Sequence, residues 1–385
     1  MKHLYTLVLL FIISGMAVKG QEQQTDKILI EFMKPGDPDA QARNYNLLPW
    51  PEEAKASAYK AAEIWASYLE ITVPIRVKFG WCDNISAAGI GSPMLSYQYT
   101  DNNYYPLALI NQLLGYDKNS DTADIICVFN SNINVGWYFG IDGDIGLTPD
   151  PNNPGVQYFQ MDFLTTALHE VCHGLGLVTT MTINNGIGSW GGSVSGKTNI
   201  YDTFIVDKNG YSLVDESHYK KDSKELANIL TSDNIYWSGS YALLANNKNA
   251  VKINAPSKWI DRNSICHIDG IYYKTENSLM SGIGFEGGEH QHFPGSIVLG
   301  MLQDIGWTLK SGATTATNKI QLESPVKVYT SGYEIVIEGC KQTDKVMIYD
   351  FSGNVRSISY GPGQIYLPSG LFIVRVADKT YKVKL

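Results

Sequence analysis

The sequence predicts an α+β domain followed by a small all-β module. Between residues 51 and 176, a helical pattern, two strand-like segments and a second helical pattern follow one another, which is typical of an α+β core. Beyond residue 318 the segments become short and alternate in polarity, as in a small β-sandwich. The length of 385 residues suits a division into two or three domains.

The composition excludes two broad classes of protein. With 44% apolar and 18% charged residues, the chain is too hydrophobic and too weakly charged to be intrinsically disordered. Its 30 basic and 38 acidic residues give a net charge of −8, so it has no basic footprint for nucleic acid. We therefore expect a globular protein without a nucleic-acid partner.

Residues 1–20 have the pattern of a signal peptide. A basic start precedes an apolar run from Leu4 to Val18, and small residues near its end favour cleavage before Gln21. A membrane anchor is the alternative, but it would need about 20 apolar residues, and this run is shorter. We expect a secreted or cell-surface protein with no stable membrane span.

The domain expected at residues 50–310 begins with one helix and two strands. The polar residues 21–49 before it are expected to be a lead-in. A helix of about 20 residues should begin at Pro51, because apolar residues follow at three- and four-residue intervals and acidic residues occupy its first turn. The alternating segment 75–81 predicts a half-buried strand, and the apolar segment 124–129 predicts a central strand.

A loop and a second helix follow. Residues 141–157 are rich in Gly, Pro, Asp and Asn, which predicts a loop. From a candidate N-cap at Asp162, the second helix should run to about Gly174, with Gly176 as its C-terminal stop. Residues 180–275 contain few long periodic segments.

The last part of the chain has a different texture. Residues 311–318 are rich in Ser, Thr and Ala and are expected to be a linker, and residues 319–385 are expected to form the small β-sandwich. Its predicted strands are 334–338, 345–349, 371–376 and 381–385.

The second helix carries the motif His169-Glu170-Val171-Cys172-His173. Histidines four residues apart lie on one helical face, so both imidazoles can bind one zinc ion. Glu170 then lies beside the metal, where it can act as a general base toward water. The alternative is a helix that carries these residues by chance, but its amphipathic pattern, its stop glycines and the expected export favour a zinc site.

A catalytic zinc site needs a third protein ligand. His267, His290, His292 and Asp202 are the candidates. His267 is favoured because Met280 follows it by thirteen residues, within a short Leu-Met-Ser-Gly segment.

The order of these elements resembles the leishmanolysin-like branch of the metzincins, as found in secreted bacterial HExxH proteins. There, a long insertion (here residues 177–266) separates the HExxHxxG helix from the third histidine, and a methionine turn follows. The resemblance covers about residues 50–310 and implies a metzincin-like zinc peptidase domain. It implies one catalytic zinc bound by His169, His173 and His267, with Glu170 as base and Met280 supporting the site.

The sequence departs from the metzincin pattern in two places. Thr179 stands where many metzincins have their third ligand, and Gly282 stands where many carry a tyrosine that assists the oxyanion. Tyr272 and Tyr273 are near enough in sequence to substitute for that tyrosine.

Five cysteines leave at least one thiol unpaired. If Cys172 and Cys266 both flank one zinc ion, they could form a disulfide that closes a long loop. The equally weighted alternative is that Cys172 is a small buried apolar residue. A bond between Cys82 and Cys127 on neighbouring strands is a weaker expectation.

Residues 319–385 resemble the C-terminal sorting domain of the type IX secretion pathway. The similarity rests on residues 346–350, on the segment 367–374 and on the basic-apolar end 381–385. It implies the type IX secretion machinery as a partner. The alternative is an accessory adhesion or packing domain.

The expected function is therefore that of a secreted zinc metalloendopeptidase acting on protein or peptide substrates. One alternative is a non-catalytic, zinc-stabilised surface binding protein, in which Cys172 or Asp202 closes the fourth metal position. Another is a hydrolase of a different polymer that uses the same site. Ca²⁺ is a candidate second metal at Asp142-Gly143-Asp144.

Overall fold

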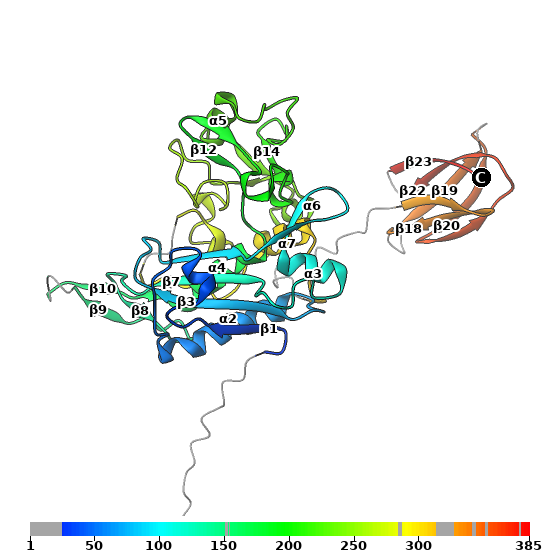
Figure 1. Cartoon of the computed structure of the whole chain (residues 1–385). Helices are drawn as coiled ribbons and strands as arrows, with labels where there is room; N and C mark the ends of the chain where they lie inside the picture. Colours follow the sequence, from blue (N-terminus) through cyan, green and yellow to red (C-terminus); the bar gives the residue numbers. More distant parts are fainter. Residues whose placement is uncertain are drawn as a thin grey trace, which may run out of the picture. The chain divides into compact units, whose positions relative to one another are not determined.

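A computed structural model describes residues 25–150, 153, 155–283, 287–312, 327–340, 344–350, 353–376 and 379–385 (Figure 1). The expected signal peptide, residues 1–20, lies outside them. The chain divides into two compact units, Met1–Thr315 and Ala316–Leu385. This division falls within the expected linker, residues 311–318. Each unit is described by itself below.

The first unit is built on a five-stranded sheet with the order β1-β3-β7-β4, to which β2 adds at β3. β1, β3 and β7 are parallel, while β2 and β4 run antiparallel to their neighbours. The expected strands 75–81 and 124–129 are confirmed as the adjacent strands β3 and β7. The five strands are β1 (Ile28–Phe32), β2 (Leu47–Leu48), β3 (Ile75–Cys82), β4 (Gly89–Pro93) and β7 (Ile125–Asn130).

The segment 21–49 is more than a lead-in. β1 pairs in parallel with β3 from Ile28↔Ile75 to Phe32↔Phe79, and β2 pairs with the end of β3. Because two of its strands belong to the central sheet, the expectation of a separate lead-in is corrected for the part of it that the structure describes.

Two long helices cover one face of the sheet. α2 (Lys55–Tyr68), preceded by the 3₁₀ turn Glu52–Ala54, forms where the first helix is expected. α4 (Phe163–Leu175) forms where the second is expected. The two pack together, and the indole Nε1 of Trp65 donates a hydrogen bond of 3.1 Å to the carbonyl of Leu168. α3 (Leu107–Leu114) and α7 (Ser296–Ile305) complete the main hydrophobic core of this unit.

A smaller core covers the opposite face of the sheet. It contains Met33, Leu47, Cys82, Ile126 and Val128, and includes Ala40 of the short helix α1 (Pro38–Gln41). Alternate residues of β7 therefore enter different cores, as the two-residue period of a strand requires.

The connection before α4 contains a hairpin rather than only a loop. β9 (Leu147–Pro149) and β10 (Gln157–Phe159) pair antiparallel inside and just beyond the expected loop 141–157. The other short strands of this half are β5 (Ser96–Gln98), β6 (Tyr104–Pro106), β8 (Trp137–Tyr138) and β11 (Met161–Asp162).

Short elements fill the insertion between α4 and His267. β14, β15 and β16 form a three-stranded antiparallel sheet, and β12 and β13 form a hairpin against α5. The elements are β12 (Thr182–Asn184), β13 (Ile187–Ser189), β14 (Ile205–Asp207), β15 (Ile235–Trp237), β16 (Val251–Lys252), α5 (Lys224–Leu230) and α6 (Ser240–Ala245), with 3₁₀ turns η2 (Gly192–Val194) and η3 (Tyr201–Phe204). Beyond the insertion lie the 3₁₀ turns η4 (Gly270–Tyr272) and η5 (Ser278–Met280).

The second unit consists of two antiparallel sheets, with strand orders β17-β18-β21 and β20-β19-β22-β23. Their apolar residues form a single core that includes Ile335, Ile337, Val346, Ile348 and Val374. The four expected strands are present, and three more were not expected. The strands are β17 (Lys327–Ser331), β18 (Glu334–Glu338), β19 (Lys345–Asp350), β20 (Val355–Tyr360), β21 (Gly363–Tyr366), β22 (Leu371–Val376) and β23 (Lys379–Lys384).

Within the described residues, no helix combines the length and the apolar character needed to cross a membrane.

Candidate metal centre

Helix α4 places two of the expected ligands on one face. Asp162 caps its N-terminus, where the carboxylate accepts a 2.6 Å hydrogen bond from the amide of Thr165. Gly176 ends it at φ 127°, a conformation that favours glycine. Gly174 allows close packing on the sheet, because a Cβ atom there would lie 2.2 Å from the Ile125 side chain. His169 and His173 are thus held one turn apart on a helix fixed at both ends and along its packed face.

The third expected ligand comes from a bend 98 residues further along the chain, directly after the turn formed by residues 261–266. The amide of Asn254 donates to the carbonyl of His267 at 2.9 Å, and the amide of Ile268 donates to the carbonyl of Met280 at 2.8 Å. The segment that carries His267 therefore lies between the end of the insertion and the methionine turn, bonded on both sides.

The three imidazoles converge on one point. Nε2 of His169 lies 3.1 Å from Nε2 of His267 and 3.1 Å from Nε2 of His173. One ring nitrogen from each residue lies within 4.8 Å of the others. Within the described ranges, these histidines are the one group of three or more His, Cys, Asp or Glu side chains gathered so closely.

Backbone carbonyls fix the tautomer of each ring. Nδ1 of His169 donates to the carbonyl of Leu279 at 2.6 Å, Nδ1 of His173 to Leu177 at 2.7 Å, and Nδ1 of His267 to Asn263 at 2.9 Å. Because a carbonyl can only accept, each Nδ1 must carry the proton. In the neutral rings each Nε2 atom then carries a lone pair and no proton, and the three Nε2 atoms face one another.

The three rings are neutral. Burial, together with the neighbouring His267, lowers the pKa of His169 to about 3. Burial likewise lowers the pKa of His173 and of His267. Close, unprotonated nitrogens repel one another unless a cation lies between them, so the arrangement suits a metal ion.

The geometry fits zinc. Two imidazoles on a tetrahedral zinc with bonds of about 2.0–2.1 Å have their nitrogens about 3.3 Å apart, close to the two distances of 3.1 Å. The Nδ1–carbonyl bonds are the outer partners that orient histidine ligands in metal sites. His169 is partly exposed, whereas His173 and His267 are each 7% exposed.

Glu170 lies on the side of α4 that faces strand β4. The amide of Gly91 donates to its carboxylate, and burial raises the pKa of that carboxyl to about 8 although this bond lowers it. A Cβ atom at Gly89 would lie 2.8 Å from Oε1 of Glu170, and one at Gly91 would lie 1.9 Å from its backbone carbonyl. The two glycines of β4 therefore make the space in which Glu170 sits, and sequence analysis missed them although their alternation on one strand face was visible.

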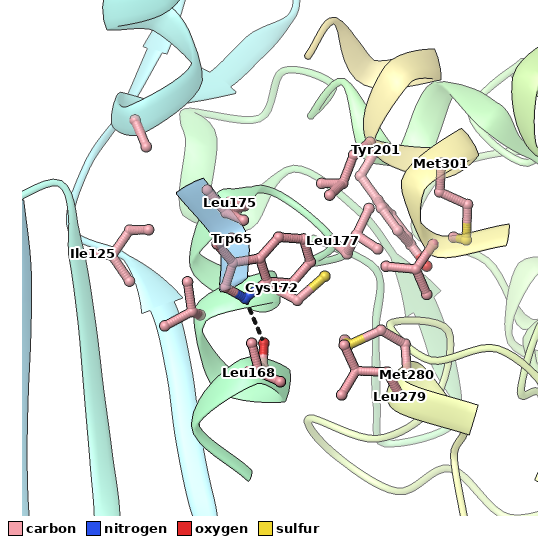
Figure 2. Packing of buried hydrophobic residues seen from close by; sticks show 14 of the residues in the cluster. Trp65, Ile125, Leu168, Cys172, Leu175, Leu177, Tyr201, Leu279, Met280 and Met301 are labelled. Atoms are coloured by element: carbon pink, nitrogen blue, oxygen red, sulfur yellow. Dashed lines mark hydrogen bonds between the residues drawn. The ribbon is translucent and has the colours of Figure 1, made fainter. Parts of the chain in front are cut away.

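Met280 lies in a buried turn whose backbone bonds to the segment that carries His267. It is 1% exposed in turn η5, and the preceding residue, Leu279, supplies the carbonyl that orients His169. Figure 2 shows Leu279 and Met280 on one side of α4 and Ile125 of the sheet on the other. The turn and the sheet thus enclose the helix that carries two ligands.

The other candidate ligands have other partners. Asp202 accepts hydrogen bonds from the hydroxyl of Thr179 at 2.6 Å and from the amide of Thr180 at 2.9 Å, so it fastens the chain just after α4. His292 contacts the N-cap Asp162 at 3.0 Å, and its ring lies 5.0 Å from that of His290. The structure brings none of these side chains into the three-histidine group.

The two tyrosines considered as oxyanion helpers also have partners elsewhere. The hydroxyl of Tyr272 accepts from Asn246 at 3.1 Å and from the amide of Lys252 at 3.2 Å. The hydroxyl of Tyr273 donates to Glu289. None of these three bonds leads to the three histidines.

The structure forms neither candidate disulfide, because all five cysteines are free thiols. The Cys172–Cys266 pairing is thus corrected: both residues are buried, and Cys172 packs in the main core, in the direction of Tyr201 in Figure 2. Cys82 and Cys127 belong to the cores on opposite faces of the sheet, so these two side chains do not meet and form no disulfide.

Two further features are candidates for ligand binding, and neither is lined by the three histidines. In the loop considered for Ca²⁺, Asp142 accepts from the hydroxyl of Tyr138 and from the amide of Asp144.

A cavity of about 300 Å³ lies beside turn η5, lined by Tyr273, Lys274, Thr275, Ser278, Gly288, Glu289, His290 and Gln291.

A protein-family model described as SPBPB7E8-like matches residues 52–238, slightly less than half of the chain. The matched region includes His169, Glu170 and His173 but ends before His267. The description names no activity. No curated protein matches the chain.

Proposed function

We propose that this protein is a zinc-dependent endopeptidase in which His169, His173 and His267 bind one catalytic zinc and Glu170 is the general base. The observation that carries the proposal is the convergence of three unprotonated Nε2 atoms, each oriented through its Nδ1 by a backbone carbonyl. A glutamate next to the first ligand gives this cluster a group that can move a proton.

In the proposed reaction, zinc supplies a Lewis acid that makes water more acidic and polarises the substrate carbonyl. The Glu170 carboxylate accepts the proton from the attacking water and delivers it to the leaving amine. The amide of Gly91 holds this carboxylate, and the positive charge of a zinc ion bound by the histidines would favour its anionic form over the neutral form that burial alone favours.

Several features support a metzincin-like arrangement of the domain. β4 is an antiparallel edge strand on an otherwise mostly parallel sheet, and it packs against the helix that carries Glu170. A methionine turn lies directly after the third histidine segment and is bonded to it at Ile268 and Met280.

The proposed location is the bacterial cell surface or the medium. The apolar pattern of residues 1–20 supports export, and the β-rich unit from residue 327 onward supports a sorting module for type IX secretion. The protein would then be synthesised with an N-terminal and a C-terminal targeting segment around one catalytic domain.

The alternative of a non-catalytic zinc-stabilised binder has less support. A structural zinc site closes its fourth position with a further side chain. The two side chains considered for that role, Cys172 and Asp202, are not in the histidine group. A partly exposed His169 also suits a site that a substrate must reach.

Zinc content and casein cleavage test the proposal together. We expect the purified chain to contain one zinc per molecule, to cleave casein, to lose cleavage on chelation and to regain it when zinc is restored. Zinc-loaded protein without peptidase activity would favour the binder or a hydrolase of another polymer. A chain that binds no zinc would contradict the proposal altogether.

A further inference from the structure

The loop that presents His267 contains an unusual backbone conformation. Ile265, two residues before the ligand, has a φ of 71°. This left-handed region is costly for a β-branched residue and is normally occupied by glycine or asparagine. Ile265 is nonetheless fully buried in the main core, so its side chain adds packing while its backbone is strained.

The strained residue lies within the turn that precedes His267. Residues 260–264 form a tight turn, in which the amide of Ser264 donates to the carbonyl of Ile260 at 2.9 Å. The turn continues to Cys266, and His267 and Ile268 then lie between Asn254 and Met280. The carbonyl of Asn263, in the turn, orients the ring of His267, at the bend that follows it. The conformation of Ile265 therefore determines whether these two residues meet.

Both polar groups of the Ile265 backbone are held. Its amide donates to the carbonyl of Asn254 at 2.8 Å, and its carbonyl accepts a 2.6 Å hydrogen bond from the hydroxyl of Tyr201. Tyr201 is fully buried in turn η3, and its ring packs on Trp237 with centroids 4.9 Å apart. The hydroxyl of Tyr201, a residue of the insertion, thus bonds directly to the strained peptide. Figure 2 shows Tyr201 among the buried hydrophobic residues near α4.

We propose that Tyr201 is a positioning residue for the third metal ligand: its hydroxyl holds the strained Ile265 peptide in the conformation that presents Nε2 of His267. This inference rests on the proposed zinc site. Without the hydroxyl, Ile265 can relax to a negative φ, which turns His267 away from the carbonyl of Asn263 and from the other two imidazoles. The insertion then has a function in the metal centre, because it supplies the Tyr201 hydroxyl that holds His267 in its metal-binding position.

The test compares Tyr201→Phe with Tyr105→Phe in the full chain. Both variants remove one hydroxyl from a buried tyrosine, but the hydroxyl of Tyr105 donates to Asp101 and does not contact the ligand loop. Zinc affinity is measured by competition with a chelator, and the coordination of Co²⁺ by its visible absorption. We expect Tyr201→Phe to lose about 10- to 100-fold in zinc affinity, the range typical of outer-partner changes, and to alter the Co²⁺ spectrum. Tyr105→Phe should match the wild type.

A double-mutant cycle with Ile265→Gly sharpens the test. Glycine adopts the positive φ without strain, so removing the Tyr201 hydroxyl should reduce zinc affinity less in the Ile265→Gly background. Should Tyr201→Phe alone not fold, the relaxed double variant replaces it and is compared with Ile265→Gly. Equal losses in both backgrounds would overturn the strain argument.

Hydrogen exchange separates this inference from the proposed function. In the metal-free chain, the amides of residues 260–268 should exchange faster in Tyr201→Phe than in the wild type and in Tyr105→Phe. If the wild type binds no zinc, the proposed function fails, and this exchange experiment still decides whether Tyr201 holds the loop. Unchanged exchange together with unchanged zinc affinity and Co²⁺ spectrum would overturn the role of Tyr201.

Discussion

Helix α4 and the loop around His267 supply the same kind of ligand to the candidate metal centre by different means. On the helix, His169 and His173 are neighbours because of the helical period, and the helix is capped by Asp162 and Gly176. In the loop, His267 depends on long-range contacts to Asn254 and Met280 and on a strained Ile265. The helix half is therefore determined locally and is rigid, whereas the loop half requires the rest of the domain to be folded.

The largest effect on peptide cleavage is expected when the proposed general base on helix α4 is removed. Glu170→Gln keeps the shape of the side chain but removes the base, so peptide cleavage should fall by about 10²- to 10⁴-fold while zinc remains bound. Cleavage rate and zinc content of the same sample measure this. Cleavage at the wild-type rate would show that another group takes the proton.

A smaller effect is expected from the strand that faces the helix. In Gly89→Ala the new Cβ would lie 2.7–2.9 Å from side-chain atoms of Glu170, so the carboxylate must move. A displacement of this size can reduce kcat by about 10- to 100-fold, while zinc affinity stays the same because no histidine is touched.

Gly192→Ala is the matched control for this substitution. A Cβ atom there has no neighbour within 4 Å, so activity should not change. If Gly89→Ala were as active as Gly192→Ala, the placement of Glu170 against β4 would be incorrect.

The stability of the protein should depend on pH through Asp202, which lies in the insertion between helix α4 and the His267 loop. Asp202 bonds to the residues after α4, and burial raises its pKa to about 6 from an ordinary value of 3.8. The folded state then binds a proton that the unfolded state releases, so the free energy of unfolding decreases as the pH rises from about 4 to about 6. This group can account for a loss of at most about 3 kcal/mol.

Asp202→Asn removes this titration. The variant loses the hydrogen bond from the amide of Thr180 and should be less stable than the wild type at pH 4, with a smaller difference at pH 7. Denaturant unfolding at the two pH values measures this. A difference that grows with pH would contradict the assigned direction.

The smallest effect is expected from removing the second unit. It has its own core and contributes no residue to the histidine group. A chain that ends before Ala316 should therefore keep zinc binding and cleavage within about twofold of the full chain. A large loss would mean that the metal centre depends on the C-terminal unit.

The two halves also differ in how far the sequence predicts them. Helix α4, its caps and the ligands His169 and His173 follow from periodicity and from one short motif. His267 needed a resemblance to known proteases, because a ligand 98 residues away leaves no periodic signal.

Other contacts could not be derived for the same reason. β1 joins β3 across 47 residues of sequence, and the space for Glu170 is made by Gly89 and Gly91, which lie on another strand. The disulfide expected between Cys172 and Cys266 assumed that proximity to one metal brings two thiols together, but Cys172 packs into the core instead. Tertiary packing decides such contacts, and local patterns carry little information about them.

The central claim is that a helix and a distant loop form one metal centre. The most direct measurement is the zinc content and casein cleavage of the wild type and of His267→Ala. Our account predicts stoichiometric zinc and cleavage in the wild type, and the loss of both in a variant that remains folded. Zinc and cleavage that survive in His267→Ala would contradict it, because the helix half would then act without this loop.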